Sequence, residues 1–431
     1  MAAITILDNP LATGGTFPQD VNDAGQIVGY YIDAQGSHGF IYDNGAFSAV
    51  SQNVVNLEGI NNAGQIVGST NTDTLHPYDI NNAGQVVGSF TDANNASQSF
   101  ISVNGNTTGL SFPGASSTSA RGINDLGHVV GYWTGTDSAF PGITISHGFF
   151  YDGNTWSALD ALVGVNGTFA EGVSNSDQIV GYYVGSNGAS HGFTFDKPTA
   201  TLTSVDMQGA LNTYLYGVNN VGEMVGAFLD GNGRTYGFSV PTSPDIKVTD
   251  TTVGQSFLPI TFPYSGPVAG LEQQYIYPGG HSINVSVSSN NWFLKSGPGQ
   301  DAIQAFGGYN VLDGSTGSNF LTGGSGTDTF FVDDRSPPAD IWTTVNGFHA
   351  GDDATVFGIV PAANNSNFQW TDNEGAAGFT GLTLHVLMQF APTASLTLPG
   401  YSTSDLGNGR LTVAFGNEPD GTPFMHITAS S

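Results

Sequence analysis

The segment VNDAGQIVG, residues 21–29, decides the fold of the first half of the chain because near-copies of it recur along the sequence. The copies begin at Ile60, Ile80, Ile123, Val173 and Val218 and read INNAGQIVG, INNAGQVVG, INDLGHVVG, VSNSDQIVG and VNNVGEMVG. Most open the turn N-x-x-G with Asn and close it with Gly, which is typical of a type I turn ending in a left-handed residue. Each copy therefore predicts two antiparallel strands joined by a tight turn.

A second element follows most copies and predicts a third strand. It reads HGFIYD at His38, HGFFYD at His147, HGFTFD at His191 and YGFSV at Tyr236, with a weaker equivalent, QSFISV, at Gln98. Its residues alternate as in a half-buried strand, and a short further strand such as FSAVS, WSALD or LTSVD comes next. Four-stranded meanders repeated every 40–50 residues or so are typical of a β-propeller.

The ends of this region predict how the ring closes. The last unit stops at Val240 without a fourth strand, and the N-terminal ITILDNP resembles the missing one, so we expect it to complete the last blade and leave no open edge. Only 20 residues separate Ile60 from Ile80, which leaves room for a hairpin. We expect a propeller over 1–240 with five full blades plus an inserted hairpin, or six blades with one truncated. A linear solenoid of the same repeats is the alternative.

The quoted repeats, over about residues 18–240, resemble the bacterial extracellular HAF-repeat family. Its HGF and N-x-x-G-Q-I-V-G signatures stand in this sequence as given above. The resemblance implies an extracellular location and a repeat fold, and it brings no settled activity.

A different repeat follows a linker that we predict at 241–249, within a second domain over 250–431. From Ser296 the chain divides into nines: SGPGQDAIQ, AFGGYNVLD, GSTGSNFLT and GGSGTDTFF. The fourth position is always Gly, the sixth is Asp or Asn, and the eighth is apolar (Ile303, Leu312, Leu321 and Phe330). Gly permits a tight left-handed turn, Asp supplies a hard oxygen ligand, and an apolar eighth residue fills the interior.

The nines, over 296–331, resemble the nonapeptide of RTX proteins, which form a parallel β-roll that binds Ca²⁺. The resemblance implies that Asp301 shares a calcium site with Asn319, and Asn310 with Asp328. The metal-site residues that we predict are Asp328, Asp301, Asn310, Asn319, Gly299, Gly308, Gly317 and Gly326. One carboxylate per site is few, so we expect one or two loosely held ions. The alternative is an empty roll whose Asn side chains form hydrogen-bonded ladders.

Residues 266–431 resemble the β-rich C-terminal module of alphaproteobacterial secreted proteins. The resemblance rests on FFVDDR, ADIWTTVNGFHAGDDATVFGI and LTLPGYSTSDLGNGRLTVAFG. It implies sandwich-like strands flanking the roll and export by type I secretion machinery through an uncleaved C-terminal signal. The N-terminus accordingly has neither the basic nor the apolar region of a cleavable signal peptide.

The composition excludes several classes. Lys and Arg number 7 against 35 Asp and Glu, a net charge of −28, so neither nucleic acid nor an anionic membrane surface is an expected partner. Gly is abundant while Lys, Glu and Arg are scarce, which indicates an all-β chain. There is no Cys to form disulfides or thiolate sites, and no apolar run reaches the roughly 18 residues that span a bilayer.

No catalytic signature stands out, and we predict neither catalytic nor cofactor-binding residues. His38, His147 and His191 occupy one position of the repeat, which favours a structural role, and HExxH, G-x-S-x-G and P-loop motifs are absent. Aromatic pairs that follow Val-Gly are candidate sugar platforms, with inter-blade core as the alternative. They are Tyr30, Tyr31, Tyr132, Trp133, Tyr182 and Tyr183.

These observations predict a non-enzymatic, secreted, calcium-binding surface or matrix protein with a structural, self-assembling or adhesive role. Its expected partners are copies of itself or a cell-surface polysaccharide, besides the secretion machinery. A glycan-binding propeller lectin is the alternative, and an unrecognised hydrolase is the third hypothesis.

Overall fold

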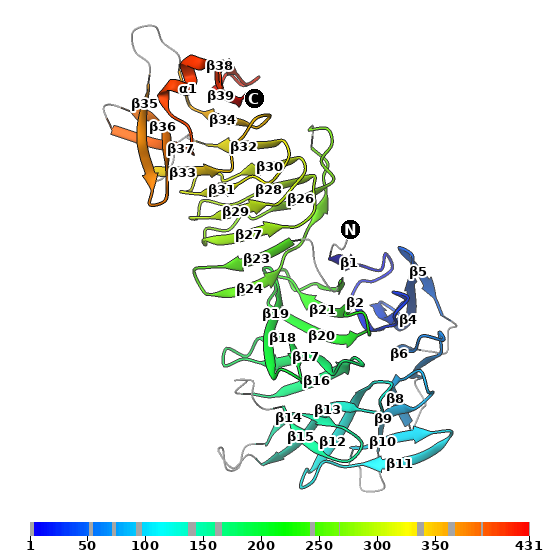
Figure 1. Cartoon of the computed structure of the whole chain (residues 1–431). Coiled ribbons are helices and arrows are strands. Elements are labelled where there is room, and N and C mark those ends of the chain that lie inside the picture. Colours follow the sequence, from blue (N-terminus) through cyan, green and yellow to red (C-terminus); the bar gives the residue numbers. More distant parts are fainter. Residues whose placement is uncertain are drawn as a thin grey trace. The chain divides into compact units, whose positions relative to one another are not determined.

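The computed structural model divides the chain into two compact units, Ala2–Pro244 and Asp245–Ser431 (Figure 1). The structure describes residues 4–50, 55–70, 75–91, 97–136, 144–159, 166–241, 246–266, 268–333, 340–360, 367–388 and 391–430. The prediction of an all-β chain is confirmed, because one short helix, α1 (Thr403–Asn408), interrupts the strands of these residues. Across the same ranges, no helix has the length and apolar character needed to cross a membrane.

The unit Ala2–Pro244 is a β-propeller built from antiparallel meanders, in which each strand pairs with the next along the chain. The first three meanders are β2 (Gly15–Val21), β3 (Ile27–Asp33), β4 (Gly36–Asp43) and β5 (Ala46–Ala49); the hairpin β6 (Asn56–Ile60) and β7 (Ile66–Ser69); and β8 (Leu75–Ile80), β9 (Val86–Thr91), β10 (Ser97–Val103) and β11 (Asn106–Leu110). The next three are β12 (Ser117–Ile123), β13 (Val129–Thr136), β14 (Thr144–Tyr151) and β15 (Trp156–Ala158); β16 (Thr168–Val173), β17 (Gln178–Val184), β18 (Ser190–Asp196) and β19 (Thr201–Met207); and β20 (Asn212–Val218), β21 (Met224–Leu229) and β22 (Thr235–Val240).

The last meander takes its fourth strand from the other end of the chain. Strand β1 (Thr5–Leu7) pairs antiparallel with β22, placing Leu7 opposite Gly237. Leu7 is fully buried in one cluster with Phe40 and Val225, so this strand also contributes to the core. A contact between residues so far apart in sequence closes the ring, and the linear solenoid alternative is wrong.

The number of blades differs from the prediction of five to six. Four meanders stand as separate four-stranded sheets, which gives four complete, separate blades. The β16–β19 meander and the β6–β7 hairpin supply the remaining two repeat units of the ring.

A β-bulge in the innermost strand of each repeat unit lets neighbouring units approach closely. It falls, for example, between Ala170 and Gly172 in β16. A Cβ at Gly172 would lie 2.8 Å from the carbonyl oxygen of Tyr216 in the next unit, so a side chain there would clash with backbone. Two units place Asp20 and Asp79 at this position instead.

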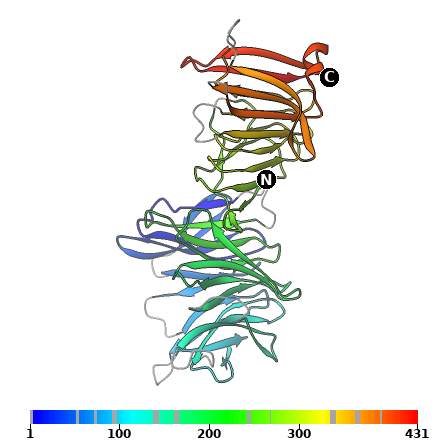
Figure 2. The ribbon, with the colours of Figure 1, turned by 90° about the vertical axis from the view of Figure 1, so that its left-hand side faces the viewer.

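The unit Asp245–Ser431 contains two stacks of parallel strands whose partners are mostly 18 residues apart, such as Asn284 with Ala302 and Asn310 with Asp328 (Figures 1 and 2). Successive strands alternate between the stacks. One stack holds β27 (Ile283–Val287), β29 (Ala302–Ala305), β31 (Phe320–Thr322) and β33 (Ile341–Asn346), and the other holds β26 (Gln273–Ile276), β28 (Trp292–Lys295), β30 (Asn310–Asp313), β32 (Asp328–Val332) and β34 (Asp353–Phe357).

The two stacks enclose one core, in which the apolar eighth residues of the nines are at most 1% exposed (Ile303, Leu312, Leu321 and Phe330). Further strands extend both stacks, all of them in antiparallel pairs except for β37 (Ala391–Pro399), which pairs in parallel with β33. They are β23 (Ile246–Asp250), β24 (Gln255–Leu258), β25 (Phe262–Pro263), β35 (Phe368–Ala376), β36 (Phe379–Met388), β37 (Ala391–Pro399), β38 (Leu411–Asn417) and β39 (Pro423–Ala429). Ile246 and Val248 belong to this core, so β23 begins inside the range predicted as a linker, 241–249, of which 242–245 lie outside the described residues.

Candidate functional site

The N-x-x-G turns carry the side chains that meet at the propeller axis. In the first, Asn22 Oδ1 accepts the backbone N–H groups of Ala24 (3.1 Å) and Gln26 (3.0 Å). Gly25 has a φ of 78°, the left-handed conformation that favours glycine. The fifth repeat departs from this pattern, because Asp177 adopts a φ of 58° where the other repeats have Gly.

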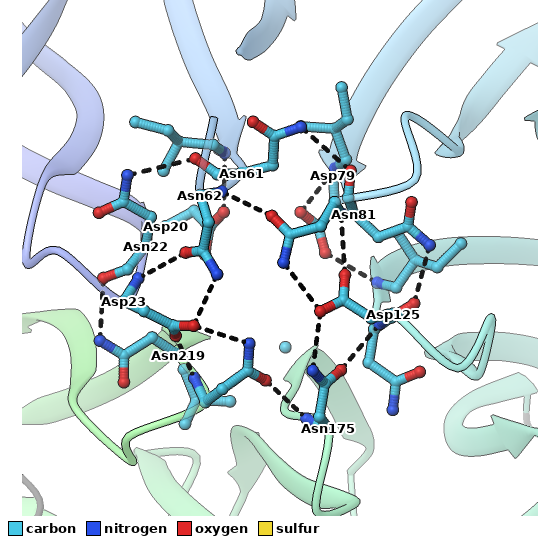
Figure 3. Close-up of a pocket in the computed structure, with 18 of the residues that line it drawn as sticks. Asp20, Asn22, Asp23, Asn61, Asn62, Asp79, Asn81, Asp125, Asn175 and Asn219 are labelled. Atoms are coloured by element: carbon cyan, nitrogen blue, oxygen red, sulfur yellow. Dashed lines mark hydrogen bonds between the residues drawn. The ribbon is translucent and has the colours of Figure 1, made fainter. Parts of the chain in front are cut away.

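The residue after each turn-opening residue forms what we call the axial ring (Figure 3). Its backbone N–H donates to the side-chain oxygen of its counterpart in the next repeat unit. The six bonds, of 2.7–2.8 Å, run from Asp23 to Asn62, Asn82, Asp125, Asn175, Asn220 and back to Asp23. All six repeat units, including the hairpin, are therefore linked by one closed circuit of hydrogen bonds.

The two carboxylates of the axial ring lie three units apart and are fully engaged. Asp23 Oδ2 accepts the side-chain amides of Asn62 (2.6 Å) and Asn220 (3.2 Å). Asp125 Oδ2 accepts those of Asn82 (2.8 Å) and Asn175 (2.7 Å). Burial opposes ionisation of Asp125, yet the bonds from Asn175 and Asn82 lower its pKa. The cavity here has a volume of about 50 Å³, which suits a few waters rather than an organic ligand.

Behind the axial ring, the two bulge carboxylates join neighbouring units. Asp20 accepts the N–H groups of Val21 and, across the interface, Ile60, both at 2.8 Å. Asp79 does the same for Ile80 and, in the next unit, Ile123, both at 2.7 Å. Burial raises the pKa of both carboxyls, that of Asp79 to about 7.

The residues within the bulges form a second tier, which we call the charged layer. It consists of Gln19, Glu58, Tyr78, Arg121, Glu171 and Tyr216. The Arg121 guanidinium lies 4.1 Å from the centre of the Tyr78 ring, and its Nε lies 3.4 Å from Glu171 Oε2. Burial raises the pKa of Glu58 to about 7, although Arg121 opposes the shift. The cavity in this layer measures about 30 Å³, room for roughly two waters.

Half-buried aromatic side chains form a third tier, which we call the aromatic layer. On the innermost strands they lie two residues before the charged layer, further from the N-x-x-G turns. Tyr132 contacts Phe169 of the next unit with 4.9 Å between ring centres, and Tyr182 contacts Tyr214 at the same distance. Within units, Phe17 stacks on Tyr30 and Phe169 on Tyr182, at 5.0 and 4.7 Å. Side chains alternate along a strand, so this layer lies on the side of the charged layer away from the axial ring.

The second residue of each aromatic pair has a different role. Tyr31, Trp133 and Tyr183 stack on His38, His147 and His191, with ring centres 5.2, 4.3 and 5.2 Å apart. His38 also contacts Asp33 at 2.9 Å, and His191 contacts Asp206 at 3.0 Å. These contacts lie within single blades, so the recurring histidine packs the blade.

In the second unit, the structure brings together both pairs of predicted metal residues. Asp301 N donates to Asn319 Oδ1 (3.1 Å), and Asn310 N donates to Asp328 Oδ1 (3.1 Å). Ile283 N donates in the same way to Asp301 Oδ1 (2.8 Å). These bonds form two ladders between turns 18 residues apart, the arrangement expected of the alternative in which polar side chains hold the turns.

The four predicted glycines lie in these stacked turns (Gly299, Gly308, Gly317 and Gly326). A Cβ at Gly317 would lie 1.7 Å from the carbonyl oxygen of Gly299, and one at Gly326 would lie 2.2 Å from that of Gly308. Close stacking therefore requires glycine here whether or not an ion binds.

One oxygen of the predicted carboxylates differs from the rest. Both oxygens of Asp328 accept N–H groups, Oδ2 from Gly324 at 3.0 Å. Asp301 Oδ2 is buried with no well-formed hydrogen bond, although the Ser296 hydroxyl favours its ionised form. Burial raises the pKa of both carboxyls. Over the described ranges, no three His, Cys, Asp or Glu side chains converge as metal ligands.

Sequence reasoning missed two sets of residues. Asp352 extends one ladder by accepting Asp328 N at 2.9 Å. Its signal is the segment GFHAGDDAT at 347–355, with Asp sixth and an apolar eighth residue. The charged layer is the second set that the sequence analysis did not predict. A polar or aromatic residue directly before each Gly or Asp of the bulge is the sequence feature that could have indicated it.

Comparisons with known proteins add little. No protein-family model and no curated protein matches the chain. The β-propeller domain of the Trilobed protease from Pyrococcus furiosus is 8% identical, with a TM-score of 0.34 over 52% of this chain and 81% of that one. The Aleuria aurantia lectin in complex with Fucα1-6GlcNAc is 11% identical, with a TM-score of 0.28 over 62% of this chain and 96% of that one. The BP39L lectin from Burkholderia pseudomallei is 10% identical, with a TM-score of 0.24 over 56% of this chain and 68% of that one. Likenesses this distant carry no conclusion about ligand or activity.

Proposed function

We propose that this protein is a non-catalytic saccharide-binding protein that acts outside the cell, with the aromatic layer of the propeller as its binding surface. The observation that carries the proposal is the series of half-buried rings at successive unit interfaces, Tyr132 with Phe169 and Tyr182 with Tyr214. The C–H faces of a sugar pack on such rings, while tyrosine hydroxyls pair with its hydroxyl groups.

Charge favours a neutral saccharide. The chain carries a net charge of −28, which repels polyanions. Arg121 is the cation of the charged layer, and it already pairs with Glu171 and lies over Tyr78. An acidic sugar would therefore have to compete with Glu171 for this guanidinium.

We propose no catalysis in the charged layer. Glu58 and Glu171 have raised pKa values, and carboxyls in unlike environments are the groups used in glycoside hydrolysis. However, a cavity of about 30 Å³ admits waters and not a sugar ring. The hydrolase hypothesis therefore depends on a substrate reaching these carboxyls from the aromatic layer.

Calcium binding and type I secretion stay part of the proposal for the second unit. Calcium prefers six to eight oxygen ligands, and N–H donors already occupy Asp328 and one oxygen of Asp301. The donor set thus fits calcium poorly, except at Asp301 Oδ2. We therefore place any calcium site at the Asp301 turn.

The test is titration of the full chain with neutral oligosaccharides by calorimetry, comparing Tyr182→Ala with Tyr183→Ala. Tyr182 belongs to the aromatic layer, whereas its neighbour Tyr183 stacks on His191, so it is the matched control. We expect Tyr182→Ala to weaken binding at least tenfold and Tyr183→Ala to leave it within twofold. Equal effects contradict the assignment, and release of reducing sugar during the titration contradicts the non-catalytic proposal.

A further inference from the structure

A groove of about 540 Å³ lies on the outer face of the β27–β29–β31–β33 stack, within the range of volumes typical of small-ligand sites. Paired residues of four adjacent strands form its floor, in the order Asn284, Ala302, Phe320 and Thr344. Gly375 and Ala376, near the tip of the β35–β36 hairpin, line one side. Neighbouring strands are about 4.8 Å apart, so the floor repeats its chemistry at that interval.

Two aromatic side chains in this groove are held in fixed orientations. Trp342 is 38% exposed, and its indole Nε1 donates to Thr397 Oγ1 at 2.8 Å. The edge of His385 packs against the indole with 5.6 Å between ring centres. Phe320 meets Phe379 edge to face at 4.7 Å. A ring fixed by its neighbours loses little entropy when a ligand stacks on it.

Unpaired amides accompany these rings. The side chains of Asn284 and Gln300 are exposed, and neither makes a hydrogen bond to another described residue. Each amide offers two donors and an acceptor, which suits a ligand rich in hydroxyl groups. The groove therefore combines apolar platforms with free amides on neighbouring strands.

Three classes of ligand fit the groove poorly. Neither Lys nor Arg lines it, so phosphates and acidic sugars lack a counter-charge. Nucleic acid stacks on aromatic rings but needs cations for its backbone. A peptide that adds a strand needs a free sheet edge, whereas β29 and β31 are paired on both sides.

We propose that this groove is a second binding site, specific for a neutral saccharide chain, that functions independently of the propeller. The pyranose faces stack on Trp342 and Phe320, and the hydroxyl groups pair with the amides of Asn284 and Gln300. The proposal does not need the aromatic layer to bind sugar, although it would make the whole protein bivalent for neutral glycans. Two linked sites raise avidity for a long polymer without any new contact.

The experiment titrates the full chain with cellohexaose, laminarihexaose and maltohexaose, and with hexagalacturonate as the acidic counterpart. We expect at least one neutral hexasaccharide to bind and the acidic one not to. Trp342→Ala should weaken this binding at least tenfold, and Trp342→Phe, which keeps a ring, should weaken it less. Gln300→Ala should weaken it several-fold, and it should still fold, because the side chain it removes is exposed and makes no hydrogen bond to another residue that the structure describes.

The control is Phe415→Ala, which removes an exposed ring elsewhere in the same unit and should leave binding unchanged. Trp342→Ala should also weaken the binding that remains in a Tyr182→Ala background, which separates the groove from the propeller site. The proposal is overturned if no neutral hexasaccharide binds, if hexagalacturonate binds as well, or if Trp342→Ala and Gln300→Ala bind like the parent. If Tyr182→Ala weakens binding and adding Trp342→Ala weakens it no further, all binding belongs to the propeller.

Discussion

The axial ring of the propeller and the turn ladders of the second unit use the same chemistry with different topology. In both, a backbone N–H donates to an Asn or Asp side-chain oxygen in the neighbouring unit of the ring or the neighbouring turn of the stack. Examples are the bonds from Asn220 to Asp23 (2.7 Å) and from Asp301 to Asn319 (3.1 Å). The ring returns to its start, so each acceptor has its donor. The ladders run in one direction and end.

The two arrays also differ in how fully their carboxylate oxygens are hydrogen-bonded. Every oxygen of Asp23 and Asp125 in the axial ring accepts at least one hydrogen bond. In the ladders, Asp301 Oδ2 is buried without a well-formed hydrogen bond. Both oxygens of Asp328, in the other ladder, accept hydrogen bonds, so the oxygen left for solvent, protons or ions belongs to the Asp301 turn.

The largest effect is expected from opening the ring. Deleting residues 1–9 removes β1, so β22 becomes an edge strand and the buried side chain of Leu7 is lost. Loss of one large buried side chain alone costs about 2–5 kcal/mol. Calorimetry of the full chain should show the propeller transition shifted strongly downward and the second unit's transition unchanged. Coincident scans of the parent and the truncated chain would contradict closure by this strand.

A smaller effect should follow from Asp20→Ala, which breaks a link between units without opening the ring. The substitution leaves the N–H groups of Val21 and Ile60 without acceptors in a buried site. Each orphaned group costs about 1–3 kcal/mol, so urea unfolding should show a loss of about 2–4 kcal/mol. Asp152 is the control, because it also accepts two backbone N–H groups but in an exposed turn, where water can replace it, so Asp152→Ala should cost about 1 kcal/mol or less. Equal losses in both variants would refute the bridging role.

The repeats could be predicted from the sequence because each carries its own turn chemistry. N-x-x-G fixes a hairpin locally, and the apolar eighth residue of each nine fixes an inward strand face. Residues whose roles depend on contacts with neighbouring units could not be predicted from local sequence in this way. Arg121 occupies the repeat position that is Gln19, Glu58 or Tyr78 in other units. Only the closed ring brings these residues together. Trp342 likewise gains its platform from Thr397 and His385, which are distant in sequence.

The charged layer should make the propeller less stable as the pH rises. The pKa of Glu58 is about 7 in the folded chain against 4.5 ordinarily, so the folded state binds the proton more tightly. Its stabilising contribution is complete below about pH 4.5 and is lost as the pH approaches 7. Glu58→Gln should remove about 2 kcal/mol of the difference between pH 5 and pH 8 in the propeller transition. An unchanged pH profile would mean that Glu58 titrates normally.

The smallest effect distinguishes a calcium site from a simple ladder in the second unit. A site with one available carboxylate oxygen should be weak, with a Kd near the 10⁻⁴–10⁻³ M of extracellular modules. Calcium at one to ten times Kd then adds only about 0.4–1.4 kcal/mol to stability. If the Asp301 turn binds the ion, calcium should raise the second transition in the parent chain and in Asp328→Asn, but not in Asp301→Asn. Asp301→Asn keeps the acceptor for Ile283 N–H, so its transition without calcium should stay close to that of the parent. A calcium response that survives Asp301→Asn would move the ion to another turn. No response in the parent chain would leave the polar ladders and the packed core to hold these turns without a metal.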